Sequence, residues 1–327
     1  MKSWWLVADI GGTNARFWAL APGTDQPFWA CQYLVEDCPD FLTVITHTLA
    51  ELADSTKAVG PPERACFAVA CPTDIERMVF TNSHWNFSAA ELESALPGCS
   101  VEIINDFAAV AHAIPALNPA DTLQLGGGSE LQNKAKVVLG AGTGLGVAAL
   151  IPDSGRYLIL ESEGGHADYA PIGDLQIEVK RILRSQFNRV CIERVLSGPG
   201  LVNVCRALGS IQQRTVKFTT PAEIVAAAIA DQDELALETL DFFCNVAGAV
   251  AGNLALTFAA KGGVYIAGGV LPRFSAVLSN SGFRSAFEDK GRFRGYLSDI
   301  PCYLVTKTDI GLFGASRYLT VDNKPHV

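Results

Sequence analysis

Asn105 and Asp106 interrupt an otherwise apolar stretch, VEIINDFAAVA, at residues 101–111. The residues before the pair predict a buried strand, and the residues after it predict an apolar helix. Asn and Asp are strong helix N-cap residues, so capping is the simplest interpretation. The alternative is catalysis, because open α/β sheets place reactive side chains just past the carboxyl ends of their strands. On this stretch alone the cap is favoured.

Three glycine-rich segments also follow predicted strands: VADIGGTNARF, VVLGAGTGLGVA and VYIAGGVLPRF. Glycine lets the backbone turn sharply, and successive N–H groups in such a turn can cradle phosphate oxygens. The segments match neither the Walker pattern nor the GxGxxG fingerprint, and each alone is best explained as a tight turn. Together they favour a nucleotide site split across two lobes. The candidate residues are Asp9, Gly11, Gly12, Thr13, Asn14, Gly140, Gly142, Thr143, Gly144, Gly268 and Gly269.

The elements that must position these residues alternate between strand and helix, which is typical of an α/β protein. Capping boxes at Ser88 and Thr220 begin helices, and the first helix runs through Leu96. A faint similarity between the first two glycine-rich segments suggests two similar α/β lobes. The predicted strands are residues 4–8, 65–70, 101–104, 136–139, 146–151, 263–267 and 301–305.

A long helix is predicted at about residues 235–260. The apolar region 246–271 contains Asn253 and Lys261 and is broken by two glycines, so a core helix followed by a strand is favoured over a membrane span. The first ten residues lack the features of a signal peptide. We therefore expect a cytoplasmic protein that does not associate with membranes.

Composition narrows the range of partners. The 327 residues carry a formal net charge of −9, which disfavours nucleic-acid binding because the phosphate backbone would be repelled. The nine cysteines are scattered and odd in number, unlike a zinc site or a disulfide framework. They are interpreted as small, mostly buried residues in a reducing compartment.

The motifs DIGGTNAR, EIINDF, GAGTGLG, EGGHADYAP, ERVLSGPGLVN, GGVYIAGGV and GFRSAFEDKGRF occur in this order. Together they resemble the bacterial glucokinases of the sugar kinase, heat-shock protein and actin superfamily, from about Leu6 to Leu319. The resemblance implies a two-lobed actin-like ATPase (ribonuclease H-like) α/β fold with a sugar and ATP cleft between the lobes. The expected lobes are 1–116 with 307–327, and 117–306. The implied partners are glucose, ATP and Mg²⁺, and the implied assembly is a homodimer.

The resemblance also assigns roles to residues. The implied reaction moves the γ-phosphoryl group of ATP to the 6-hydroxyl of glucose, with Asp106 at the cap position acting as general base. Asn105, Glu163, His166 and Glu193 match the family's sugar-binding residues, although residue type alone would make the glutamates surface charges and the histidine structural. Asp9 is the expected Mg²⁺ contact, through water, because its carboxylate is an oxygen ligand. The first two glycine-rich segments match the phosphate turns, and Gly268 and Gly269 match the adenosine motif.

Two sequence details refine the expectation. Related repressors and sugar kinases carry a cysteine-rich zinc motif just after the sugar-binding histidine, whereas Ala167 to Ala170 hold no cysteine, so no structural zinc is expected. Ile75 stands where the family usually has glycine, which affects the loop 71–82.

The alternatives are a kinase of mannose, fructose or an amino sugar, a hexose-sensing regulator, and a filament ATPase. The regulator is disfavoured by the net charge and by the few residues before Asp9.

Overall fold

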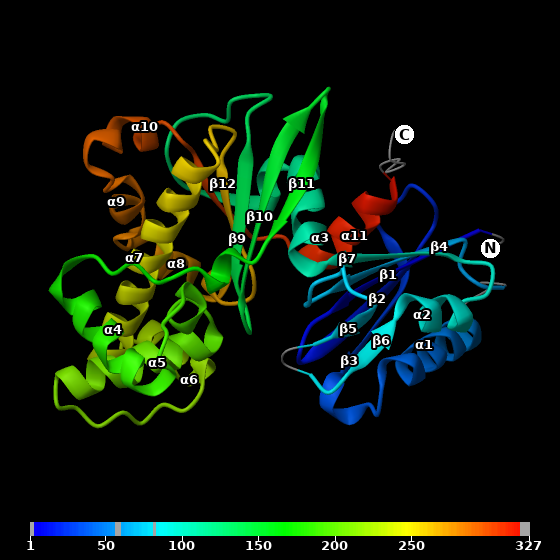
Figure 1. Ribbon diagram of the computed structural model, residues 1–327, viewed down its shortest axis with the longest axis horizontal. Coiled ribbons are helices and arrows are strands. Elements are labelled where there is room, and N and C mark those ends of the chain that lie inside the picture. Colours follow the sequence, from blue (N-terminus) through cyan, green and yellow to red (C-terminus); the bar gives the residue numbers. More distant parts are fainter. Residues whose placement is uncertain (1–2, 56–59, 81–82, 321–327) are drawn as a thin grey trace. The chain divides into compact units, whose positions relative to one another are not determined.

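The computed structural model describes residues 3–55, 60–80 and 83–320, and the chain divides into two compact units. Unit 1 comprises residues 1–117 and 307–327, and unit 2 comprises residues 118–306. In Figure 1 unit 1 is coloured blue to cyan with its last helix in red, and unit 2 runs from green to orange. Each unit has its own sheet and its own hydrophobic core.

Unit 1 is built on a five-stranded sheet with the order β3-β2-β1-β4-β7. The first three strands form an antiparallel meander, and β4 and β7 then add in parallel to β1. A separate hairpin joins β5 to β6. The elements are β1 (Trp5–Ile10), β2 (Asn14–Leu20), β3 (Pro27–Leu34), α1 (Phe41–Ser55), β4 (Arg64–Val69), β5 (Arg77–Val79), β6 (Asn86–Ser88), α2 (Ala89–Ala95), β7 (Ser100–Asn105), α3 (Asp106–Ala113) and α11 (Ile310–Thr320).

The central strand β1 is buried on both faces of the unit 1 sheet. Leu6, Ala8 and Ile10 join a cluster that contains residues of α1 and α2, whereas Trp5 and Val7 join a second cluster that contains residues of α3 and α11. Figure 1 shows α1 and α2 on one side of this sheet and α3 and α11 on the other. Because alternate side chains point to opposite faces, a strand covered on both sides is almost wholly apolar.

Unit 2 has a six-stranded sheet with the order β11-β10-β9-β12-β13-β8. Without the edge strand β8, it repeats the order and strand directions of unit 1, as the similarity between the glycine-rich segments predicts. The elements are β8 (Thr122–Gly126), β9 (Lys136–Ala141), β10 (Leu145–Asp153), β11 (Arg156–Ser162), η4 (Gly164–His166), α4 (Gly173–Phe187), η5 (Ile192–Arg194), α5 (Gly198–Ile211), α6 (Pro221–Ile229), α7 (Glu234–Thr257), β12 (Val264–Ala267), α8 (Ser275–Asn280), α9 (Phe283–Glu288), α10 (Arg294–Ser298) and β13 (Cys302–Val305).

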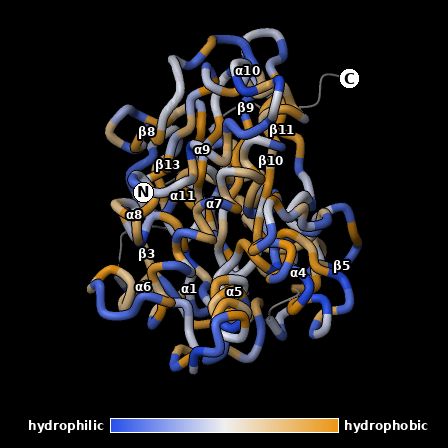
Figure 2. The backbone as a smooth tube through the Cα atoms, turned by 90° about the vertical axis from the view of Figure 1, so that its left-hand side faces the viewer, coloured by the Kyte–Doolittle hydropathy of each residue, from blue (hydrophilic) through white to orange (hydrophobic). Residues whose placement is uncertain are grey.

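Helix α7 is long and apolar enough to cross a membrane by length and composition, but 78% of its most apolar window is buried inside the structure. Gly248 and Gly252 of this helix leave room for backbone carbonyls of Phe283 and Phe287, which any larger residue would overlap. Figure 2 shows hydrophobic residues gathered along neighbouring α5, which contributes to the same core. The predicted core helix is therefore confirmed, although it ends at Thr257 rather than near residue 260.

The local signals in the sequence place most of these elements correctly. Each predicted strand is present, with ends that shift by at most two residues. Both capping boxes form: Ser88 with Glu91 at the start of α2, and Thr220 with Glu223 at the start of α6. Five of the nine cysteines are buried, as expected for small core residues: Cys66, Cys71, Cys205, Cys244 and Cys302.

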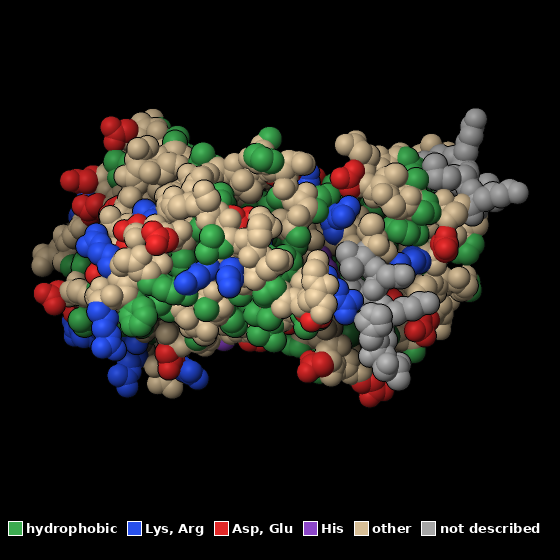
Figure 3. Space-filling model, turned by 90° about the horizontal axis from the view of Figure 1, so that it is seen from above, with side chains coloured by type: hydrophobic (Ala, Val, Ile, Leu, Met, Phe, Trp, Pro, Cys, Tyr) green, Lys and Arg blue, Asp and Glu red, His purple; other side chains and the backbone are tan. Residues whose placement is uncertain are grey.

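Charged side chains lie mostly at the surface. On the face drawn in Figure 3, acidic and basic side chains are interspersed among uncharged ones. Elsewhere in the described residues, some basic side chains pair with acidic neighbours: Arg181 with Glu178, and Arg189 with Asp168. Such mixing is typical of an ordinary solvated surface.

Candidate active site

The catalytic candidates of unit 1 lie at one edge of its sheet. Strands β1, β4 and β7 are parallel neighbours, so their carboxyl ends meet at the same edge. The register places Asp9 beside Ala68 and Ala68 beside Ile104, which separates Asp9 from Ile104 by two strand spacings, or about 10 Å. The glycine-rich turn after β1 and the Asn105–Asp106 pair after β7 therefore share this edge.

Asn105, not Asp106, is the N-cap of α3. The Asn105 carboxamide oxygen accepts hydrogen bonds from the backbone N–H groups of Phe107 at 2.8 Å and Ala108 at 3.2 Å. The prediction that Asp106 occupies the cap position is thus wrong by one residue. The side-chain oxygen of Asn105 accepts the hydrogen bonds of the N–H groups that have no partner within the first turn of the helix. The amide nitrogen of Asn105 has two N–H donors that the cap does not use.

Asp106 is the first residue of α3, where the helix dipole stabilises a negative charge. Its Oδ1 accepts a hydrogen bond from the backbone N–H of Phe107 at 2.9 Å. This contact holds the carboxylate in one orientation at the end of a rigid element. A carboxylate held this way is suited to accept a proton from a bound hydroxyl group.

The turn after β1 is a tight hairpin fixed by hydrogen bonds around it. The Gly11 N–H donates to the Asn14 carbonyl at 2.9 Å, and the Val35 N–H donates to the Thr13 carbonyl at 2.9 Å. The Gln32 amide donates to the Asn14 side-chain oxygen at 2.7 Å. Thr13 remains exposed at the tip. The turn therefore presents its hydroxyl group from a fixed backbone.

Asp9 lies in a small cluster of charges. The Arg16 guanidinium is 3.8 Å from the Asp9 carboxylate and 3.6 Å from that of Asp309. Burial raises the pKa of the Asp9 carboxyl above its ordinary value, Arg16 opposes this shift, and Asp309 adds to it. Sequence reasoning missed Asp309, which nothing in the local pattern marks, and gave Arg16 no role although it lies inside the quoted motif DIGGTNAR.

In unit 2, the second and third glycine-rich segments lie side by side. The turn joins β9 to β10, and the Gly142 N–H donates to the Gly144 carbonyl at 2.8 Å. Gly268 follows β12 with φ +86°, and a Cβ there would lie 2.5 Å from the Ala141 carbonyl. Gly269 has open space around it. Two strand ends thus offer exposed backbone at one edge of this sheet.

The predicted sugar residues of unit 2 gather around the start of β10. The Glu193 carboxylate accepts a hydrogen bond from the Leu145 N–H at 2.9 Å. It also lies so close to Gly144 that a Cβ there would be 2.5 Å from Oε2. Gly165 of η4 packs so tightly on the Leu145 carbonyl that any side chain would overlap it. The structure therefore places the second glycine-rich turn in direct contact with Glu193, a predicted sugar residue.

Glu163 precedes η4 and His166 is its last residue, and their side chains are 66% and 58% exposed. Their carboxylate and imidazole lie 3.9 Å apart. Ser197, which the sequence analysis did not single out, supports the neighbouring segment: its hydroxyl donates to the Glu193 carbonyl at 2.7 Å and accepts from the Gly200 N–H at 3.0 Å. A serine followed by Gly-Pro-Gly is a recognisable helix start, so the sequence held a signal for it.

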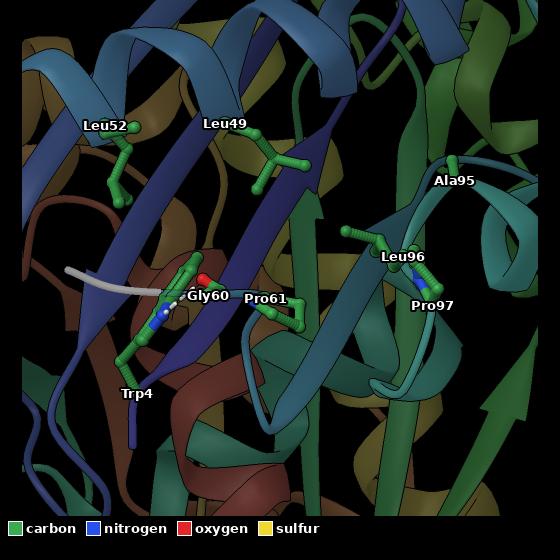
Figure 4. A pocket seen from close by; sticks show the side chains of 9 residues that line it. Trp4, Leu49, Leu52, Gly60, Pro61, Ala95, Leu96 and Pro97 are labelled. Carbon is green, nitrogen blue, oxygen red and sulfur yellow. Dashed lines mark hydrogen bonds between the residues drawn. The ribbon is translucent and has the colours of Figure 1, made fainter. Parts of the chain in front are cut away.

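A cavity of about 240 Å³ lies elsewhere in unit 1. Trp4 precedes β1, Pro61 precedes β4, and Leu96 precedes β7, so this cavity is at the amino ends of the parallel strands. Figure 4 shows its mainly apolar lining and the hydrogen bond from the Trp4 indole to the Gly60 carbonyl. The catalytic candidates lie at the opposite, carboxyl ends, so the cavity is not part of the candidate site.

Within residues 3–55, 60–80 and 83–320, no group of three or more His, Cys, Asp or Glu side chains is arranged to hold a metal ion. The expected absence of a structural zinc stays a prediction. The Asp9 carboxylate carries oxygen atoms, the ligand type that Mg²⁺ prefers.

Comparison with known proteins relates this geometry to a family. A sequence model of the glucokinase family matches residues 6–321. A glucokinase of Yersinia enterocolitica is 43% identical over 319 residues, covering 98% of this chain and 97% of the relative. A crystal structure of glucokinase from an Antarctic psychrotroph superposes with a TM-score of 0.82 at 34% identity, covering 98% and 99% of the two chains.

A more distant structure shares the fold. The ROK family glucokinase of Streptomyces griseus, solved in complex with glucose and AMPPNP, gives a TM-score of 0.67 at 19% identity and covers 97% of this chain and 99% of its own. The two repeated sheets with glycine-rich turns at their strand ends define an actin-like sugar kinase. Within that class the chain belongs to the glucokinase family, and it is an enzyme.

Proposed function

We propose that this enzyme transfers the γ-phosphoryl group of ATP to the 6-hydroxyl of glucose. The family match and the Yersinia relative support the activity, and the Streptomyces griseus enzyme was solved with glucose and an ATP analogue. The observation that carries the residue assignment is the fixed Asp106 carboxylate at the start of α3. The products are glucose 6-phosphate and ADP.

Asp106 is the proposed general base. As the glucose 6-oxygen attacks the γ-phosphorus, its proton passes to the Asp106 carboxylate. The bond between the γ-phosphorus and the β,γ-bridging oxygen breaks, and that electron pair leaves with ADP. Phosphoryl transfer needs mainly positioning and charge stabilisation, so one rigidly held base satisfies the requirement for proton removal.

Asn105, Glu163, His166 and Glu193 are the proposed glucose contacts. Carboxylates accept hydrogen bonds from sugar hydroxyls, while the free N–H groups of Asn105 donate to them. A site built on such hydrogen bonds rejects sugars that lack or invert a hydroxyl, because its polar groups are then left unpaired. We therefore propose that glucose is strongly preferred over galactose.

The nucleotide is proposed to bind the glycine-rich turns. Thr13 and Thr143 are exposed at two turn tips, and Gly269 faces open space, so phosphate and adenosine groups have room to approach bare backbone. Mg²⁺, when bound, neutralises charge on the phosphate oxygens, and the Asp9 carboxylate is its proposed contact through water. The proposed nucleotide residues are Asp9, Gly11, Gly12, Thr13, Asn14, Gly140, Gly142, Thr143, Gly144, Gly268 and Gly269.

The test compares glucose-dependent ADP release by the intact protein and by Asp106→Ala, with glucose binding measured on both. Loss of the base lowers turnover by about a hundredfold to ten-thousandfold while glucose still binds. Asp174→Ala is the control, because Asp174 is likewise a carboxylate in a first helical turn, that of α4, and is exposed there. An intact protein that binds glucose without releasing ADP would instead be a hexose sensor.

A kinase of another hexose is the second candidate, and Ile75 favours it. This residue is 44% exposed in the loop between β4 and β5, where the family usually has glycine. Relative kcat/KM for glucose, mannose, fructose and glucosamine, measured before and after Ile75→Gly, decides between the two.

We also propose that the protein is a homodimer and is cytoplasmic. Sedimentation of the purified protein tests the assembly, and cell fractionation tests the location.

A further inference from the structure

Two residues near the carboxyl end of the chain contact the charge cluster at Asp9. Asp309 and Gly311 lie at the start of α11, which belongs to the same unit as β1. Arg16 lies between the carboxylates of Asp9 and Asp309, at 3.8 Å and 3.6 Å. Both distances exceed the usual 2.7–2.9 Å of a charge-assisted hydrogen bond. The guanidinium is therefore shared between two partners and closely paired with neither.

The backbone at Asp309 adopts an uncommon conformation. Its φ is +52°, in the left-handed region that Asn and Asp tolerate better than most residues. The Asp309 carbonyl also accepts a hydrogen bond from the Phe313 N–H at 2.9 Å, which fixes it to the first turn of α11. The carboxylate of Asp309 is thus presented to Arg16 from a defined position.

Gly311 provides the space that Asp9 occupies. A Cβ at position 311 would lie 2.8 Å from one Asp9 carboxylate oxygen, 3.2 Å from the other and 2.9 Å from the carboxyl carbon. Contacts this short would push the carboxylate away from its present position. The position of Asp9 therefore depends on a residue about three hundred positions later in the chain.

We propose that Asp309 is a positioning residue that holds Arg16 back from Asp9 and so keeps the Asp9 carboxylate available to magnesium–nucleotide. Without Asp309, the guanidinium is free to close on Asp9 at full hydrogen-bond distance and to occupy the oxygens that magnesium needs. Gly311 acts in the same sense by leaving the carboxylate room. This inference rests on the proposed function, in which Asp9 is the Mg²⁺ contact.

The test measures ADP affinity calorimetrically, once with MgCl₂ and once with EDTA, for the full-length protein and for Asp309→Asn. Asparagine keeps the left-handed backbone and removes only the charge. The ratio of the ADP affinity in MgCl₂ to that in EDTA reports the contribution of magnesium alone. A change of protein charge that affects ADP binding equally in both conditions cancels in this ratio. We expect this ratio to fall by about two- to fivefold, the range of a partly exposed ion pair.

Asp231→Asn is the matched control, because Asp231 also has φ +52° and is exposed, but lies after α6 in unit 2. It leaves the ratio unchanged. In an Arg16→Gln background the effect of Asp309→Asn disappears, because Asp309 acts through Arg16. Gly311→Ala lowers the ratio further, while glucose affinity stays at the parent value in both the Asp309 and Gly311 variants.

An unchanged or increased ratio in Asp309→Asn overturns the proposal. So does a full effect of Asp309→Asn in the Arg16→Gln background, or an equal effect of Asp231→Asn. A loss of glucose affinity together with a lower melting temperature would assign Asp309 a purely structural role, which also overturns it. These results differ from failure of the proposed function, which would appear as absent glucose phosphorylation by the parent protein.

Discussion

The two units carry the same sheet core but fix their glycine-rich turns by different means. In each, the central strand pairs antiparallel with the strand that follows it in the chain, and on its other side it pairs in parallel with one strand, beside which a second parallel strand lies. In unit 1 the turn after β1 borders an ionic cluster of Asp9, Arg16 and Asp309. In unit 2 the turn after β9 is fixed by the Glu193 carboxylate and by a backbone hydrogen bond from Gly198 to Gly142 at 2.8 Å.

The strands at corresponding positions also end differently. In unit 1, β7 runs directly into α3, and the junction supplies Asn105 and Asp106. In unit 2, β13 is followed by the segment that returns to unit 1 and supplies Asp309 and Gly311. A repeated scaffold thus provides equivalent strand ends, while the residues placed there differ: one end carries the proposed base and the other the proposed positioning residue.

The largest expected difference between substitutions in the two units is the effect of replacing Glu193 on glucose binding. Glu193→Gln weakens glucose binding by about ten- to hundredfold, because a charged hydrogen-bond acceptor is lost, while kcat changes much less. Asp106→Ala shows the reverse pattern. Steady-state kinetics over a range of glucose concentrations measure the separate changes in KM and kcat, and Glu178→Gln on α4, a half-buried surface glutamate, is the control in the same unit. A fall in kcat with unchanged KM would show that Glu193 does not bind the ground-state sugar.

We expect a residue of unit 1, His112, to make the folded protein less stable in acid. Burial lowers the pKa of His112 to about 4 from its ordinary 6.5, and its ring packs edge-on against Tyr318 at 5.1 Å. The folded state therefore disfavours the protonated form of His112. The contribution of neutral His112 to the free energy of unfolding is fully present above pH 6.5 and is lost as the pH falls towards 4. His112→Phe removes roughly 2–3 kcal/mol of this loss.

Urea unfolding at pH 7 and at pH 4.5 measures the acid effect, and the difference between variant and parent isolates His112 from the carboxylates. Identical losses on acidification for parent and His112→Phe would contradict the prediction.

The smallest effect compares glycines of the two sheets. Gly268→Ala costs about 1–2 kcal/mol of unfolding free energy, because its backbone is left-handed and the Ala141 carbonyl is close. Gly11→Ala in unit 1 meets only the Asn14 carbonyl at an ordinary 3.7 Å and costs much less. Gly269→Ala has open space and tests nucleotide binding without altering stability. If Gly268→Ala and Gly11→Ala lowered the unfolding free energy equally, the predicted difference between the two turns would be wrong.

Particular residues show where sequence reasoning succeeds and fails. The strand before Asn105 and the capping boxes at Ser88 and Thr220 were predictable, because apolar alternation and caps are local patterns. Strands β2, β3 and β11 were not predicted, because their polar and apolar residues are mixed and their pairing partners are supplied by the sheet. The cap assignment at Asn105 and Asp106 was wrong by one residue, because either side chain suits that position.

The sequence by itself determined the alternation of strands and helices, the glycine-rich turns and the family to which the chain belongs. Only the tertiary structure decided that Glu193 contacts Leu145 and that Gly311 borders Asp9. The physical reason is distance along the chain. Local patterns report on neighbours within a few residues, whereas each of these contacts joins segments that are far apart in the sequence and meet only when their own unit has folded.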